Sequence, residues 1–166
     1  MYPMITLRLQ QISDAQRFFE ILNNPNFLYF GSQPDSIEAE IAWLAGNEKR
    51  FREHKEWNYT NLKGEEVIGG IGVKINQHRS YIGEIGYFID EAYWGQGIAT
   101  EAVRLLEIIC FEELKMTRIE LLMLPENIAS ERVATKSGYS KEGILKKALV
   151  HKDGSKRDCL LYAKTM

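Results

Sequence analysis

The segment Tyr93-Trp-Gly-Gln-Gly-Ile-Ala-Thr100 is the part of this sequence whose residue types point most directly to ligand chemistry. Glycine lets a backbone approach a ligand closely, and the free amides at a helix N-terminus attract phosphate oxygens. The segment lies between a strand predicted to end at Ile89 and a helix predicted to begin near Gly97. We interpret it as a phosphate-binding loop. A tight strand-to-helix turn without a ligand is the alternative.

Three kinds of phosphate-binding glycine loop can be compared with this segment. A Walker loop requires Gly-Lys-Ser/Thr, which is absent from the sequence. A dinucleotide fingerprint requires Gly-x-Gly-x-x-Gly, but position 100 is Thr. That fingerprint also belongs to a parallel βαβ unit, whereas hairpins are predicted before this loop. The third kind, a cradle for the pyrophosphate of coenzyme A, is the interpretation we favour.

The elements that must position this loop follow from hydrophobic periodicity and from turn residues. The expected strands are residues 5–10, 56–62, 66–75, 81–89, 117–124, 139–151 and 156–164. Helices are expected after the capping box Ser13-x-x-Gln16, after Ser36, from Gly97 and from Asn127. The order β-α-α-β-β-β-α-β-α-β-β predicts an α/β protein of the α+β type. We expect one domain, residues 1–166, with a mostly antiparallel sheet of about seven strands and about four helices.

Charge and hydropathy argue against several classes of protein. The 166 residues contain 21 Lys and Arg against 23 Asp and Glu, a net charge of −2, which disfavours nucleic-acid binding. Residues 141–166 alone carry +4, so the acidic excess precedes them. This asymmetry either reflects a solvated C-terminal hairpin or helps the acidic part attract a cation. No apolar run reaches the roughly 18 residues of a membrane span, and the start is unlike a signal peptide. We therefore expect a cytoplasmic protein, with Cys110 and Cys159 as buried thiols.

Several motifs occur in an order that is itself informative. They are Gly83-Glu-Ile-Gly-Tyr87, Trp94-Gly-Gln-Gly-Ile-Ala99, Asn127-Ile-Ala-Ser130, Ser137-Gly-Tyr139 and Gly154-x-x-x-Asp158-x-x-x-Tyr162. Together they resemble the GNAT superfamily of N-acetyltransferases, most closely its ribosomal-protein N-acetyltransferase (RimJ/RimL-type) branch. Trp94 stands where the superfamily usually has Arg or Gln, in a form that this branch favours. The resemblance extends from about Ile5 to Tyr162.

The resemblance implies a splayed sheet, the GNAT fold, that holds acetyl-CoA in a V-shaped gap, without a metal. Backbone groups of Phe88 and Ile89 would bind the pantetheine arm as an added strand would. Asn127 would contact the pantetheine from the other side, although a simple helix N-cap is an equal alternative. The pyrophosphate would be held by the amides of Gly95, Gln96, Gly97, Ile98, Ala99 and Thr100.

Acetyl transfer to an amine requires removal of an ammonium proton and stabilisation of a tetrahedral oxyanion and of a departing thiolate. The resemblance places Glu84 where many members carry the base, whereas an ion pair with a hairpin Lys or Arg is the alternative. Many members have a Tyr seven residues after the Asn, but that residue is Ala134 here. In this branch a Ser at the position of Ser130 assists the thiolate. Otherwise Ser130 is only a residue of the first helical turn.

These observations predict an acetyl-CoA-dependent N-acetyltransferase that modifies a primary amine. A protein N-terminal α-amine, a polyamine and an aminoglycoside-like amine all remain as acceptors, and a homodimer is compatible with the prediction. The missing Tyr keeps open a non-catalytic module that only binds coenzyme A, whereas Glu84 and Ser130 favour catalysis. A dinucleotide-dependent oxidoreductase is disfavoured by Thr100 and by the antiparallel strands.

Overall fold

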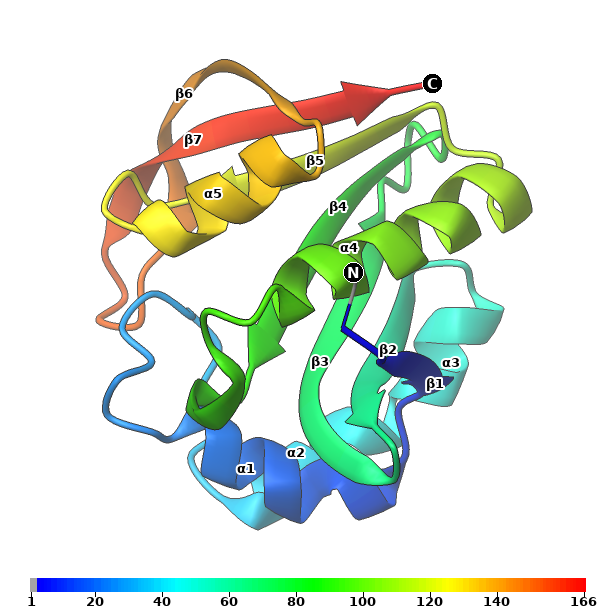
Figure 1. The fold of residues 1–166 in the computed structure, drawn as a ribbon, viewed down its shortest axis with the longest axis vertical. Coiled ribbons are helices and arrows are strands. Elements are labelled where there is room, and N and C mark those ends of the chain that lie inside the picture. The colour runs from blue at the N-terminus through cyan, green and yellow to red at the C-terminus, as the bar shows by residue number, and fades with distance from the viewer. Residues whose placement is uncertain (1–2) are drawn as a thin grey trace.

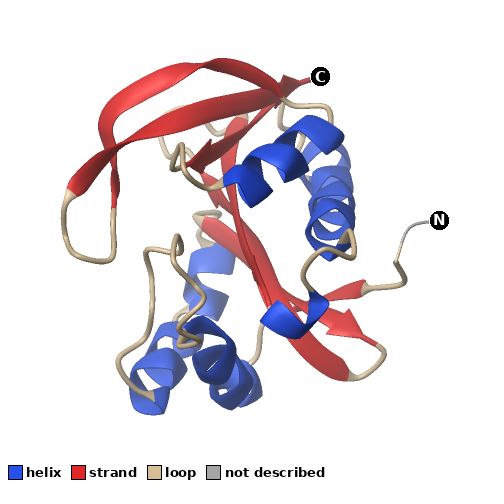
Figure 2. Ribbon diagram, turned by 60° about the vertical axis from the view of Figure 1, so that its left-hand side comes forward, coloured by secondary structure: helices blue, strands red, loops and turns tan. Residues whose placement is uncertain are grey.

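A computed structural model describes residues 3–166, whose strands form one seven-stranded sheet (Figure 1). Met1 and Tyr2, which begin the predicted domain, lie outside the described residues. The strands are β1 (Thr6–Leu9), β2 (Glu56–Lys63), β3 (Glu66–Ile75), β4 (Ile82–Ile89), β5 (Arg118–Met123), β6 (Ser140–Val150) and β7 (Lys156–Thr165). The helices are α1 (Ala15–Leu22), α2 (Ile37–Ala45), α3 (Asn47–Arg52), α4 (Ile98–Ile108) and α5 (Ile128–Lys136). Helices α4 and α5 cover one face of the sheet, and α1 to α3 cover the other (Figure 2).

The sheet has the order β1-β2-β3-β4-β5-β7-β6, and every neighbouring pair is antiparallel except β4 and β5. That parallel pair is short, because only Ile82–Glu84 is in register with Arg118–Glu120. Beyond these residues the two strands separate, so the sheet is splayed. The predicted class, element order and mostly antiparallel sheet are confirmed. The second predicted helix is divided at Gly46 into α2 and α3.

The main core lies between the sheet and α4. The helix contributes Ala102, Val103 and Leu106, each fully buried, as its 3.6-residue periodicity predicts. Burying a side chain such as Val103 or Leu106 stabilises the fold by about 1.5–3 kcal/mol. Cys110 and Cys159 are free and buried, as expected, and burial raises the pKa of Cys110 to about 12.

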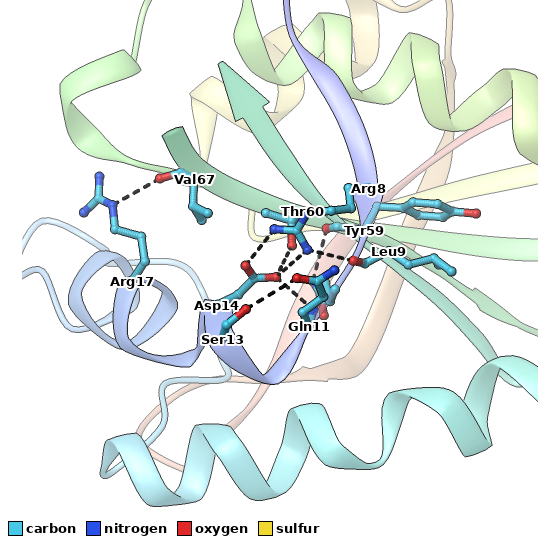
Figure 3. Close-up of polar contacts among 10 residues, drawn as sticks. Arg8, Leu9, Gln11, Ser13, Asp14, Arg17, Tyr59, Thr60 and Val67 are labelled. Atoms are coloured by element: carbon cyan, nitrogen blue, oxygen red, sulfur yellow. Dashed lines mark hydrogen bonds and ion pairs between the residues drawn. The ribbon is translucent and has the colours of Figure 1, made fainter. Parts of the chain in front are cut away.

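The start of α1 differs from the prediction. Gln11, rather than Ser13, is the N-cap of a short 3-10 turn, η1 (Ile12–Asp14), that leads into α1. Asp14 is only 3% exposed and accepts hydrogen bonds from the Gln11 amide at 2.9 Å and from Thr60 Oγ1 at 2.6 Å (Figure 3). Arg8 forms an ion pair with the same carboxylate at 2.8 Å. Because these contacts reach β1 and β2, tertiary packing overrides the local capping-box spacing.

Candidate functional site

The point at which β4 and β5 separate is the centre of the candidate site. Both strands run in the same direction, so the chain leaves both at the same end of the sheet. Helices α4 and α5 consequently begin on the same side of the molecule, at the left of Figure 1. Open backbone at a splayed strand pair and two helix N-termini are therefore placed near one another.

The glycine loop, residues 94–97, follows β4 and a 3-10 turn (Glu91–Tyr93) and leads into α4. Gly95 and Gly97 have φ angles of +74° and +77°, which L side chains rarely adopt, and a Cβ at either would meet no atom within 4 Å. Within the described chain, no backbone amide from Gly95 to Thr100 donates a hydrogen bond. These free amides lie at the positive end of the α4 dipole. The loop therefore has the open space and the donors that a pyrophosphate requires.

Trp94 replaces the usual Arg or Gln of the glycine motif. Its side chain connects this loop to the rest of the protein. Its indole Nε1 donates a hydrogen bond to the Ile89 carbonyl at 2.8 Å, and its ring lies 5.4 Å from that of Phe27. Nearby, Glu91 accepts a hydrogen bond from Asn26 Nδ2 at 2.6 Å. The loop is thus held by the segment that connects α1 to α2.

The register of β4 shows which of its backbone groups face the gap between β4 and β5. Asn76 donates to the Ile82 carbonyl, and Asp90 donates to the Ile68 carbonyl, at the two ends of the β3–β4 ladder. Because hydrogen-bonded residues alternate in an antiparallel pair, the even-numbered β4 residues bond to β3. Phe88 is one of them, so its backbone groups point away from the gap. Tyr87 and Ile89 point their backbone groups toward it, and the Ile89 carbonyl there accepts the hydrogen bond from Trp94.

Glu84 lies where the two strands separate and faces a cavity of about 430 Å³ between the sheet and helices α1 and α2. Burial among the surrounding residues raises the pKa of Glu84 above its ordinary value, whereas Lys74 opposes this rise and Glu120 adds to it. In the described chain it forms no direct ion pair, although Lys74 is its cross-strand partner. The next residue on this face is Gly86, where a Cβ would meet no atom within 4 Å. An accessible carboxylate with a raised pKa is suited to accept a proton.

A hydroxyl pair bridges the gap from β4 to α5. Tyr87 donates a hydrogen bond to Ser130 Oγ at 3.1 Å, and burial raises the pKa of Tyr87. Asn127 is the N-cap of α5, since its Oδ1 accepts a hydrogen bond from the Ser130 amide at 3.2 Å. Sequence reasoning missed Tyr87, although it closes the motif that contains Glu84. The signal that could have identified Tyr87 is its hydroxyl group, which stands at the otherwise apolar end of β4.

Residues 3–166 contain no group of three or more His, Cys, Asp or Glu side chains arranged to hold a metal ion. In the same range, the helices are too short or too polar to cross a membrane.

Comparison with known proteins gives three findings. The acetyltransferase (GNAT) domain family matches residues 5–140. A probable N-acetyltransferase of Bacillus subtilis, YjcK, is 35% identical over 115 residues, which are 68% of this chain and 64% of that protein. An uncharacterized N-acetyltransferase of Bacillus licheniformis, p20, is 37% identical over 146 residues, 86% of this chain and 82% of that protein.

The solved structures support the same fold. Mycobacterium smegmatis RimJ in complex with a CoA-disulfide superposes with a TM-score of 0.87 at 24% identity, covering 97% of this chain and 81% of that chain. At this level of identity the likeness concerns the fold. The fold of this chain is therefore a known architecture.

Proposed function

This chain belongs to the acetyltransferase (GNAT) domain family, and on that premise we propose that it is an acetyl-CoA-dependent N-acetyltransferase that modifies a primary amine. The observation that supports this most strongly is the placement of the free amides of residues 95–100 and the Glu84 carboxylate around one strand separation. The amides can bind the pyrophosphate of the cosubstrate, and the carboxylate can bind and deprotonate the amine. We further propose that residues 1–166 form a single domain that works in the cytoplasm.

Acetyl-CoA brings an activated thioester to the site. The amides of Gly95, Gln96, Gly97, Ile98, Ala99 and Thr100 would bind its pyrophosphate. The pantetheine arm would lie along β4, where Tyr87 offers its backbone groups and Ile89 its amide, so we assign Tyr87 the role first expected of Phe88. Asn127 would contact the arm from α5 through its amide group, while its Oδ1 caps the helix.

Glu84 would act as the general base. An amine is protonated near neutral pH and attacks a carbonyl carbon only after it loses that proton. Glu84 can accept the proton directly or through a water molecule, because its side chain faces the cavity. Its ionised form also attracts the incoming ammonium group.

Ser130 would stabilise the departing thiolate. Because Tyr87 donates to the Ser130 oxygen, the hydroxyl proton of Ser130 is left free to point toward a ligand. A serine hydroxyl is a weak acid, so we expect a hydrogen bond rather than full proton delivery. Tyr87 would thus be a positioning residue for Ser130.

The function is tested by incubating the protein with acetyl-CoA and a panel of primary amines. The panel contains peptides with free N-termini, polyamines and aminoglycosides. We expect release of free thiol and a gain of one acetyl group by one class of acceptor. Binding of acetyl-CoA without acetylation of any amine would instead support the alternative, a non-catalytic module that binds coenzyme A.

A further inference from the structure

Glu40 is a buried residue whose carboxylate has no partner among the described residues. It lies on α2, is only 7% exposed, and lines the same cavity as Glu84. In the described residues its side chain makes no hydrogen bond or ion pair, and burial raises its pKa. Burying a charge without a partner costs free energy. A ligand that supplies a positive charge would remove this cost.

The other charges of the cavity are arranged differently. Of the described lining residues, four are acidic, namely Asp35, Glu40, Glu56 and Glu84, and one, Lys74, is basic. Glu56 already lies 3.6 Å from Arg50, and it accepts a hydrogen bond from Asn58 at 3.1 Å. Lys74 faces Glu84 across the β3–β4 ladder. Among the described residues that line this cavity, Glu40 is thus the buried acid that no cation neutralises.

Apolar groups form much of the remaining lining. Phe88 packs edge-on against Phe18 and Phe30, with ring centroids 5.1 Å and 5.5 Å apart, and all three residues line the cavity. Glu84 belongs to the sheet, whereas Glu40 belongs to the helical layer above it. A ligand in this cavity therefore meets one carboxylate from each layer and an aromatic surface along the wall.

We propose that the acceptor carries a second positive charge, which Glu40 binds while the reacting amine lies at Glu84. This proposal rests on the proposed acetyltransferase function. The shared chemistry is a dication with an apolar connection between its charges. A small diamine has this chemistry, and so does a peptide N-terminus that is followed by a basic residue.

The experiment compares acceptors that differ only in the second charge. One arm uses an α,ω-diamine and the n-alkylamine of equal carbon number. The other uses a peptide with Lys at its second position and the same peptide with norleucine there. We expect the wild-type kcat/KM to favour the dication by roughly tenfold or more in one arm, because contacts between charged groups are the strong ones. The arm that shows this preference identifies the source of the dication.

The test variant is Glu40→Gln, which keeps the side-chain shape and removes the charge. It should lose most of the preference for the dication and change kcat/KM for the monocation by less than threefold. Its melting temperature should not fall, because a buried unpaired carboxylate is removed. Glu38→Gln is the matched control, since Glu38 is an exposed residue of the same helix outside the cavity lining. It should keep the wild-type preference.

The outcomes separate this proposal from the function on which it rests. Equal wild-type kcat/KM values for dication and monocation in both arms would overturn the proposal that the acceptor carries a second charge. The acetyltransferase function would still stand. A preference that Glu40→Gln fully retains would overturn the role of Glu40. Binding of acetyl-CoA without release of the free thiol of coenzyme A in the presence of any amine would overturn the function, and the proposal with it.

Discussion

Glu84 is placed between a positive and a negative neighbour, Lys74 and Glu120, at the last paired position of β4 and β5. Each neighbour shifts its pKa in the opposite direction from the other, and burial adds the larger, upward effect. A carboxylate in this setting holds a proton to a higher pH than a free glutamate does. It is therefore a better proton acceptor than a glutamate with an ordinary pKa would be.

We expect Glu84→Gln to lower turnover by roughly 10²–10⁴-fold, the usual effect of removing a general base. The base must be ionised, so wild-type kcat/KM should fall as the pH drops through the Glu84 pKa. Because that pKa is raised, the fall should lie above the ordinary glutamate value of 4.5. Steady-state kinetics across pH checks this, with acetyl-CoA affinity as the control. Turnover that stays equally depressed at high pH, where the amine is already deprotonated, would contradict proton removal.

The hydroxyl pair of Ser130 and Tyr87 gives a second prediction. Removal of a preorganised hydrogen-bond donor commonly costs about 10²–10³ in turnover, and we expect this loss for Ser130→Ala. Tyr87→Phe should cost roughly tenfold, the effect of one hydrogen bond, because the Ser130 hydroxyl remains but is less well oriented.

The double variant distinguishes positioning from direct catalysis. If Tyr87 acts only through Ser130, Tyr87→Phe should have no further effect on turnover in a Ser130→Ala background. Saturating acceptor and a rate-limiting chemical step are required for the comparison. A larger loss for Tyr87→Phe than for Ser130→Ala would transfer the leaving-group role to Tyr87.

At the scale of the elements, the glycine loop combines a strained conformation with open space, and the two effects can be separated. Gly97→Ala places a side chain at φ +77°, which costs about 1–2 kcal/mol of stability, and it also fills the space above the α4 N-terminus. We expect it to weaken coenzyme A binding at least tenfold, as measured by calorimetric titration. Gly154→Ala in the β6–β7 turn is the control, because Gly154 has a similar φ of +82° and equally open surroundings. It should lose similar stability and keep its affinity.

The sequence predicts these elements well where periodicity and local capping decide them. The buried face of α4 and the Asn127 cap of α5 depend on spacings within the element itself. The start of α1 depends instead on contacts of Asp14 with β1 and β2, so the predicted N-cap at Ser13 is wrong. Similarly, family motifs contain Glu84 and Ser130, but the contact from Tyr87 and the isolation of Glu40 arise only when distant segments pack together.

At the scale of the whole molecule, the sheet consists of two parts that meet along a short parallel contact. Strands β1 to β4 form one part, and β5 to β7 form the other. Beyond the register of Ile82–Glu84 with Arg118–Glu120, the strands no longer hydrogen-bond to each other. The backbone groups of Tyr87 and the Ile89 amide consequently have no strand partner on the β5 side. A ligand there would contact both parts and join them.

Residue-resolved amide hydrogen exchange tests this placement. Coenzyme A should slow exchange at the amides of residues 95–100 and at those of Tyr87 and Ile89, which gain partners. The amides of Gly86 and Phe88 already bond to β3, so their exchange should change little beyond the general stabilisation that any tightly bound ligand gives. ADP, which has a pyrophosphate but no pantetheine, is the control and should protect only the loop. Equal protection by ADP and coenzyme A at Tyr87 and Ile89 would contradict a pantetheine arm along β4, because the arm is the part that ADP lacks.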